Sequence, residues 1–240
     1  MTYTQVDAPA RRAPVSTDFP DRLIAGYEAF LGGRFSAEQQ RYRALSEMGQ
    51  KPRTMVIGCC DSRVSPEVIF DARPGELFVV RNVANLVPPY ESGGEYHGTS
   101  AALEFAVQAL RVKHIVVLGH GRCGGIRAFA DSSTAPLSPG DFIGKWINLV
   151  TPAADAIGPQ GDQTLDSYAE KLALASIGKT IDNLMTFPCV NILHGRGKLQ
   201  LHGAYFDVFS GRLKIRNRET GQFDEVIESG VERVSLFDCR

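Results

Sequence analysis

TMVIGCCDSR, residues 54–63, is the stretch that decides the fold. Its first part, Thr54 to Gly58, is a short apolar run rich in β-branched residues that ends in glycine, which is typical of a buried strand. Leu77 to Arg81 and His114 to Leu118 have the same character. Between these two runs, Thr99 to Leu110 is dense in apolar residues and indicates a buried helix. Strands that alternate with helices predict parallel crossovers and an α/β fold.

The segments around this unit complete the predicted domain. Residues 1–19 lack apolar periodicity and are predicted to form a loosely ordered arm, whereas 20–240 show no composition shift and are predicted as a single domain. Apolar residues at helical spacing predict one helix from Leu23 and a second from about Ser36 to Met48. Two stretches rich in Pro, Gly, Ser and Asp are predicted surface loops, residues 131–141 and 151–164.

The C-terminal part is predicted to extend the sheet. A capping box predicts a helix from Ser167 to about Leu184 that Pro188 closes. Val190 to Leu193 is predicted as a further strand, and Leu199 to Val208 with Arg212 to Arg216 resembles a hairpin. We therefore predict a mostly parallel central sheet of strand order 2-1-3-4, with an added C-terminal antiparallel strand and flanking helices.

Composition indicates a globular protein and little about partners. The chain has 240 residues, 43% of them hydrophobic, and a formal net charge of -1, so charge favours neither nucleic acid nor an acidic membrane. No apolar run approaches the roughly 18 residues of a membrane span, and the N-terminus lacks the pattern of a signal peptide. We expect cytoplasmic residence. The odd number of cysteines, 5, argues for reduced thiols or metal ligands rather than a disulfide framework.

Candidate metal ligands follow two of the predicted strands. Cys59 comes directly after the first strand, and His120 and Cys123, three residues apart, follow the third. In open parallel sheets, sites form beyond the carboxyl ends of strands, especially where neighbouring crossovers diverge. Two thiolates and one imidazole suit Zn²⁺ and leave one tetrahedral position open, as in catalytic zinc sites. Asp61 and Arg63 alternate with Cys59 and are interpreted as an ion pair that orients a donor at the metal.

Other interpretations of the same residues remain open. Buried cysteines are common, and a Cys-x-Asp or a His-x-x-Cys pattern matches many chains by chance. A closed structural zinc site would need a fourth protein ligand, for which the candidates are Cys60, Cys189 and Cys239. A strand-end salt bridge is the plain alternative for Asp61 and Arg63. A phosphate-binding loop at Cys123-Gly124-Gly125 lacks the Walker and dinucleotide spacings.

At this point the sequence resembles the β-class carbonic anhydrases over nearly all of the chain beyond the N-terminal arm. The matching segments are CCDSRVSPE, PGELFVVRNVANLVPPY, GTSAALEFAV, GHGRCGGI and LHGAYFDVFSGRL. The resemblance implies reversible hydration of carbon dioxide to bicarbonate and a proton by a hydroxide on zinc. It also implies Cys59, His120 and Cys123 as zinc ligands, with Asp61 and Arg63 as the catalytic pair.

The resemblance further implies a substrate pocket and an oligomer. The positions that match pocket-lining residues of plant-like members are Gln50, Phe78, Val83, Phe105 and Gly124. Gln50 would reach the site of a neighbouring subunit, and Phe105 replaces the tyrosine usual in the plant enzymes. The helices at 22–48 would embrace a partner subunit, which implies a homodimer or homotetramer.

One subgroup of the family has an inactive form in which the aspartate of the pair binds zinc. Its members carry a noncatalytic bicarbonate site built on a tryptophan, an arginine and a tyrosine. Arg81 matches the arginine, but Val56 and Phe206 stand at the other two positions. We therefore expect an open, plant-like site in which Asp61 does not bind zinc.

Two alternative functions stay open, and the residue that would carry the proton away from the site is not assigned. On the same fold, a hydrolase of carbonyl sulfide or carbon disulfide is the nearest enzyme alternative. A noncatalytic zinc-binding regulatory module is the alternative of a different class, against which Asp61 and Arg63 argue. Four histidines are candidates for a proton shuttle by residue type alone: His97, His114, His194 and His202.

Overall fold

The computed structural model describes residues 18–93, 97–131, 133 and 135–226. The chain divides into two compact units, Met1–Met48 and Gly49–Arg240, which are described separately below. Almost all of the arm predicted for 1–19 lies outside the described residues. The single domain predicted over 20–240 stays a prediction.

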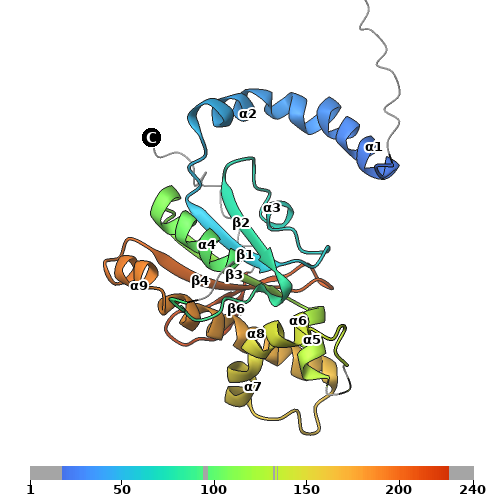
Figure 1. Ribbon diagram of the computed structural model, residues 1–240, viewed down its shortest axis with the longest axis vertical. Helices are drawn as coiled ribbons and strands as arrows, with labels where there is room; N and C mark the ends of the chain where they lie inside the picture. The colour runs from blue at the N-terminus through green and yellow to red at the C-terminus, as the bar shows by residue number, and fades with distance from the viewer. Residues whose placement is uncertain (1–17, 94–96, 132, 134, 227–240) are drawn as a thin grey trace, which may run out of the picture. The chain divides into compact units, whose positions relative to one another are not determined.

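The first unit consists of one helical stretch. It comprises α1 (Asp21–Phe30), the π-helical turn η1 (Leu31–Phe35) and α2 (Ser36–Met48), as Figure 1 shows in blue. Both predicted helices are confirmed. Phe30, Phe35 and Tyr42 pack against one another, with ring centroids 5.2 to 6.1 Å apart. None of the described side chains of these helices is buried, although several are large and apolar.

The second unit is built on a six-stranded sheet with the order β2-β1-β3-β4-β5-β6. The first four strands are parallel to one another, and the last two join the edge antiparallel. The predicted order 2-1-3-4 is therefore confirmed, with two antiparallel strands at the edge instead of one. The strands are β1 (Thr54–Cys59), β2 (Leu77–Asn82), β3 (His114–His120), β4 (Gln200–Phe206), β5 (Leu213–Arg216) and β6 (Phe223–Glu225).

Helices flank the sheet, as Figure 1 shows. The main core joins alternate strand residues, such as Ile57 and Ile115, to residues of α4, η3 and α8, such as Leu103 and Ile177. Alternation along a strand sends the residues between them to the opposite face, where Val56, Leu118 and Ala204 form a smaller cluster. The longer helical elements are α4 (Gly98–Glu104), η3 (Phe105–Leu110), α8 (Leu165–Met185) and α9 (Pro188–Gly195).

The remaining elements are short, and all of them precede α8 in the chain. They are α3 (Pro66–Ile69), η2 (Val83–Asn85), α5 (Gly124–Ala130), α6 (Phe142–Ile147), η4 (Asn148–Val150) and α7 (Thr151–Ile157). Among the described residues, no helix has both the length and the apolar character that crossing a membrane requires.

Three local predictions were wrong. Helix α8 begins at Leu165 with Thr164 as its N-cap, whose side chain accepts from the Ser167 N–H, so the capping box predicted at Ser167 does not open this helix. The other two concern helices with a proline in the first turn. Val190–Leu193 lies inside helix α9 and not in a strand, because a short apolar run does not by itself distinguish the two and Pro188 opens the helix at its first position. The loop predicted over 151–164 contains helix α7, which has a proline in its first turn. In both places proline marks the start of a helix, where its missing N–H costs nothing.

Candidate metal centre

The three candidate ligands meet at the carboxyl edge of the parallel strands. Cys59 ends β1, His120 ends β3, and Cys123 directly precedes α5. Because β1 and β3 are neighbours, with Gly58 opposite Leu118, both chain segments leave the sheet at the same edge. All three residues are buried, and their ligand atoms lie within 4.8 Å of one another. The sulfur atoms of Cys59 and Cys123 are 3.9 Å apart.

The His120 ring is prepared to bind a metal through one nitrogen. Its Nδ1 lies 2.9 Å from the carbonyl oxygen of Gly121, so this nitrogen donates and Nε2 carries the lone pair. His120 Nε2 is buried and has no hydrogen-bond partner in the described structure. An unsatisfied buried nitrogen costs about 1 to 3 kcal/mol, and coordination to a cation removes this cost.

The hydrogen bond between the two thiols shifts their pKa values in opposite directions. The pKa of Cys59 is lowered, first because the Cys123 thiol donates to its thiolate, and further by His120 and by the backbone N–H groups of Asp61 and Ala84. The pKa of Cys123 is raised, first by its hydrogen bond to Cys59 and then by burial. Without a cation the pair therefore carries one negative charge. A divalent ion between the sulfurs allows both to ionise, so this donor set fits zinc.

Asp61 and Arg63 form the predicted ion pair beside the ligands. Arg63 donates from Nε to Asp61 Oδ1 over 2.9 Å and from Nη2 to Oδ2 over 2.7 Å. These bonds hold the pKa of the Asp61 carboxyl well below its usual range. Asp61 Oδ2 lies 4.0 Å from His120 Nε2. The carboxylate is thus ionised, fixed by its partner and next to the atom that would face a metal.

Arg81 has a positioning role that the sequence reasoning missed. From the neighbouring strand β2 its Nε donates to the carbonyl of Cys59 over 2.8 Å, and its Nη2 donates to the carbonyl of Asp61 over 2.6 Å. These bonds hold the turn that carries both the ligand and the carboxylate. The only sequence signal is an arginine near the end of an apolar strand, and it gains meaning once Arg81 is known to lie opposite Gly58.

The predicted pocket residues fall into two groups. Phe78 on β2 and Phe105 on η3 pack with ring centroids 5.9 Å apart, and Phe105 is 49% exposed. Val83 in η2 packs against the first turn of α5, where a Cβ on Gly125 would meet its side chain at 2.7 Å. Gly124 begins α5, and a Cβ there would meet nothing within 4 Å.

Gln50 and Phe78 do not lie beside the ligands of their own chain: Phe78 is paired with Met55, whereas Cys59 is paired with Asn82, four residues further along β2. Gln50 is exposed and precedes the amino end of β1, whereas Cys59 lies at the carboxyl end of that strand. The strand separates the two, so Gln50 does not reach the ligands of its own chain. Its contribution to a partner's site stays a prediction.

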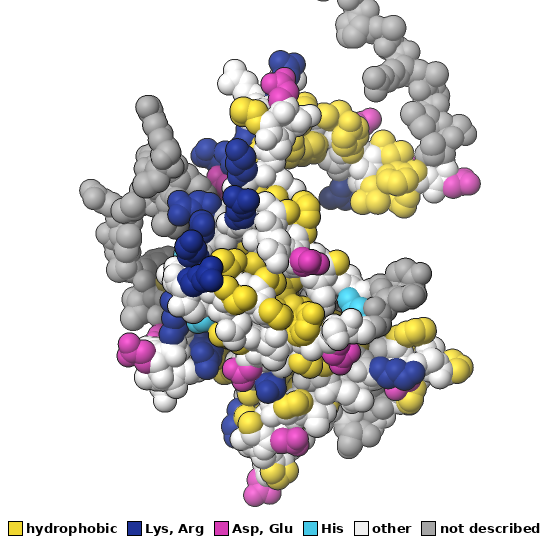
Figure 2. Space-filling model, turned by 60° about the vertical axis from the view of Figure 1, so that its left-hand side comes forward, with side chains coloured by type: hydrophobic (Ala, Val, Ile, Leu, Met, Phe, Trp, Pro, Cys, Tyr) yellow, Lys and Arg dark blue, Asp and Glu magenta, His cyan; other side chains and the backbone are white. Residues whose placement is uncertain are grey.

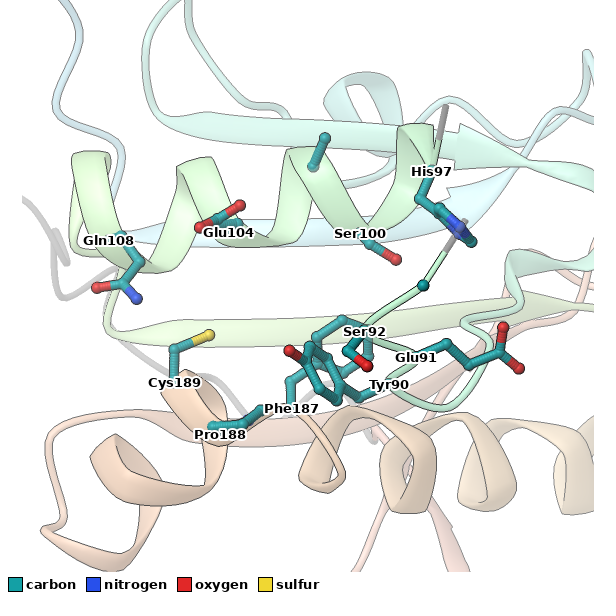
Figure 3. Close-up of a pocket in the computed structure, with 12 residues that line it drawn as sticks. Tyr90, Glu91, Ser92, His97, Ser100, Glu104, Gln108, Phe187, Pro188 and Cys189 are labelled. Carbon is teal, nitrogen blue, oxygen red and sulfur yellow. The ribbon is translucent and has the colours of Figure 1, made fainter. Parts of the chain in front are cut away.

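The alternative fourth ligands are absent from this cluster. Figure 3 shows Cys189 at a separate cavity of about 470 Å³, between α4 and the start of α9. Cys60 is exposed, and Cys239 lies outside the described residues. Within the described part of the chain, the metal-ligand cluster consists of two cysteines and one histidine. A closed structural site therefore lacks a fourth protein ligand there.

None of the four candidate shuttle histidines lines the 300 Å³ pocket that contains His120 and Cys123. His97 lines the separate cavity of Figure 3. His194 contacts the carbonyl of Leu199, and His114 is paired with His202. The proton shuttle is therefore not identified among these side chains.

The fold and this donor set define a class of protein: an α/β protein in which two cysteines and one histidine would hold zinc, with a fixed carboxylate beside them. Comparison with known proteins identifies the family. The sequence model described as carbonic anhydrase matches residues 54–213. The chain belongs to the β-class carbonic anhydrases, which are zinc-dependent lyases, and the family predicted from the sequence is confirmed.

Individual relatives agree with this assignment. Beta carbonic anhydrase 5, chloroplastic, of Arabidopsis thaliana is 36% identical over 193 residues, which is 80% of this chain but only 63% of that protein's length. The structure of the β-carbonic anhydrase CcaA superposes with a TM-score of 0.73 at 29% identity, covering 86% of this chain and 98% of CcaA. One of two tetrameric β-carbonic anhydrases of Sordaria macrospora has a TM-score of 0.68 at 28% identity, with coverages of 85% and 98%.

Proposed function

We propose that this chain catalyses the reversible hydration of carbon dioxide to bicarbonate and a proton, with Zn²⁺ held by Cys59, His120 and Cys123. The observation that carries the proposal is the buried, unpartnered Nε2 of His120, next to two thiols and the Asp61–Arg63 pair. When bound, zinc supplies a Lewis acid that lowers the pKa of water from about 15.7 to near 7.

Asp61 acts as a hydrogen-bond acceptor that orients the attacking oxygen nucleophile. An ionised carboxylate only accepts hydrogen bonds and accepts them more strongly than a protonated one, and Arg63 keeps Asp61 ionised by donating to both carboxylate oxygens. Arg63 Nη2 also donates to the carbonyl of Arg122 over 3.1 Å, which ties the pair to the loop between His120 and Cys123. The nucleophile is thereby aimed by a carboxylate that cannot rotate freely.

Apolar side chains are proposed to bind the gas. Val83 follows Asn82, the residue paired with Cys59, whereas Phe78 and Phe105 pack together near the amino end of β2 and would line the slot of a partner's site. Burial of a small apolar molecule against aromatic and aliphatic surface is favourable. The backbone N–H of Gly124 is a donor for the charged product bicarbonate. Phe105 brings no hydroxyl to this slot, so the side of the pocket that it forms is apolar.

Two substitutions and a metal analysis test this function. Cys59→Ala should lose zinc and hydration activity together, because one of three ligands is missing. Asp61→Ala should keep zinc and lose most of its activity. Stopped-flow hydration of carbon dioxide with zinc determination on the same samples measures both. Rapid hydration by protein freed of metal would contradict the proposal.

The rival reactions are separated by substrate. The same site could in principle take carbonyl sulfide or carbon disulfide, so the three gases should be compared side by side on one preparation. Carbon dioxide should be turned over fastest. A zinc-binding module without catalysis has no use for the Asp61–Arg63 pair, and a zinc-loaded chain inactive toward all three gases would favour it.

We also propose that the chain forms a homodimer or homotetramer. The Sordaria macrospora relatives are described as tetrameric. The helices of the first unit expose Leu23 and Tyr27 to 56% and 60%, and Gln50 lies away from the ligands of its own chain. A partner that covers these helices and receives Gln50 accounts for both facts. A monomeric mass by light scattering at micromolar concentration would contradict this.

Cytoplasmic residence is likewise proposed. Zinc binding requires both Cys59 and Cys123 as thiolates, and a reducing compartment keeps two thiols only 3.9 Å apart from forming a disulfide. Fractionation of the source cells checks the location.

A further inference from the structure

Basic residues gather at the edge of the sheet opposite the metal centre. In the register of the parallel strands, Thr54, His114 and Gln200 lie side by side at the amino ends of β1, β3 and β4. Arg53 and Lys113 directly precede the first two of these residues, and Lys198 lies two residues before the third. Neighbouring strands are about 4.8 Å apart, so the register concentrates three cations.

These residues line a shallow pocket of about 320 Å³. Its described lining contains three cations, one histidine, one amide and no acidic residue: Arg53, Lys113, His114, Gly197, Lys198 and Gln200. Within the described part of the chain, no salt bridge joins the three cations to a carboxylate. Figure 2 shows Lys and Arg side chains, in dark blue, gathered along one side of the molecule. Uncompensated like charges attract an anion.

A hydrogen-bonded group of side chains supports the pocket from the sheet. His114 Nδ1 and His202 Nε2 are 3.1 Å apart, and Arg218 Nη2 lies 3.1 Å from His202 Nδ1. Burial first, and then Arg53 and Arg218, lower the pKa of His114, while burial, Arg218 and His114 lower the pKa of His202 to about 4. Arg218 also donates to Gln200 Oε1 over 3.1 Å, which leaves the Gln200 amide nitrogen as the group that can donate into the pocket.

We propose that this pocket binds the phosphate group of a phosphorylated small molecule. Arg53, Lys113 and Lys198 provide positive charge and several donors, which suits an oxyanion with more than one negative charge. The Gln200 amide adds a neutral donor, and the volume leaves room for a group attached to the phosphate. The site is distinct from the metal centre, because β3 runs from His114 to His120, about 20 Å at 3.3 Å per residue.

The test uses the whole zinc-loaded chain and inorganic phosphate and pyrophosphate as probes. Isothermal titration at constant ionic strength should give saturable binding. Lys113→Gln with Lys198→Gln should weaken it about tenfold or more, because two charge-assisted contacts are lost. Lys171→Gln with Lys179→Gln on α8 removes the same charge outside the pocket and should leave the affinity within about twofold. Imidazole NMR signals of His114 and His202 should shift on titration.

Three results would overturn the proposal. Absence of saturable binding by the parent chain excludes the site. Equal affinity in both double variants, with unshifted His114 and His202 signals, would place the anion elsewhere, such as at the metal. Co-sedimentation with phosphatidic-acid vesicles, while free phosphate does not bind, would assign the cations to a lipid surface. Thermal melts of both double variants should match the parent, which shows that lost binding is not unfolding.

Discussion

Replacing Asp61 by asparagine tests the assigned mechanism most directly. The carboxylate accepts three hydrogen bonds from Arg63: from Nε over 2.9 Å, from Nη2 over 2.7 Å and from the backbone N–H over 3.0 Å. Asparagine keeps one acceptor oxygen, loses the charge and turns an NH₂ group toward either the guanidinium or the nucleophile. Loss of one positioned acceptor should lower kcat/KM by about 100- to 1,000-fold, or about 2.7 to 4 kcal/mol in the barrier.

Stability and metal content should change much less than activity. The side chain of Arg63 is 47% exposed, so solvent screens the pair and its loss should lower the free energy of unfolding only slightly. Zinc content should stay at the parent level, because Asp61 is not one of the three ligands.

Stopped-flow hydration assays with zinc analysis should be run beside Asp166→Asn. Asp166 pairs with Arg127 at the rim of the pocket that contains His120 and Cys123, but it does not contact Asp61, so this variant reports the effect of losing an exposed carboxylate near the site and should keep most of its activity. If Asp61→Asn keeps more than about a third of the parent kcat/KM with full zinc, the role given to Asp61 is wrong.

Further predictions address the metal, a close contact and pH. Removing zinc with a chelator should lower the melting temperature by several degrees in calorimetry, and added zinc should restore it, because binding stabilises only the folded chain. Gly125→Ala should cost about 1 to 3 kcal/mol in denaturant melts, since its Cβ would lie 2.7 Å from Val83, whereas Gly124→Ala, with open space, should be nearly neutral. The pKa of His202 in the folded chain is lowered to about 4, first by burial and then by Arg218 and His114. In the unfolded chain the pKa of the same imidazole is about 6.5. Between these two pKa values the unfolded chain binds more protons than the folded chain, so the free energy of unfolding should fall as the pH drops from about 6.5 to about 4. Thermal melts should show a smaller fall for His202→Gln.

Much of the site could be predicted from short-range patterns. Three-residue spacing brings His120 near Cys123, which is local geometry. The strand alternation predicted for Cys59, Asp61 and Arg63 was wrong: β1 ends at Cys59, and the ion pair forms in the following turn, where the Arg63 backbone N–H donates to Asp61 Oδ1. Apolar runs separated by a helix predicted a parallel sheet, and with it a ligand site at the carboxyl edge of that sheet. The family resemblance supplied the substrate, which spacing does not encode.

The tertiary structure decided what depends on contacts between distant segments. Val190–Leu193 is apolar enough for a strand, but it follows Pro188 and packs as part of α9. Arg81 supports the ligand turn only because β2 lies beside β1, and the basic pocket exists only because three amino ends are in register. Strand order and register are set by long-range packing, so residues that are far apart in the sequence become neighbours only in the folded sheet.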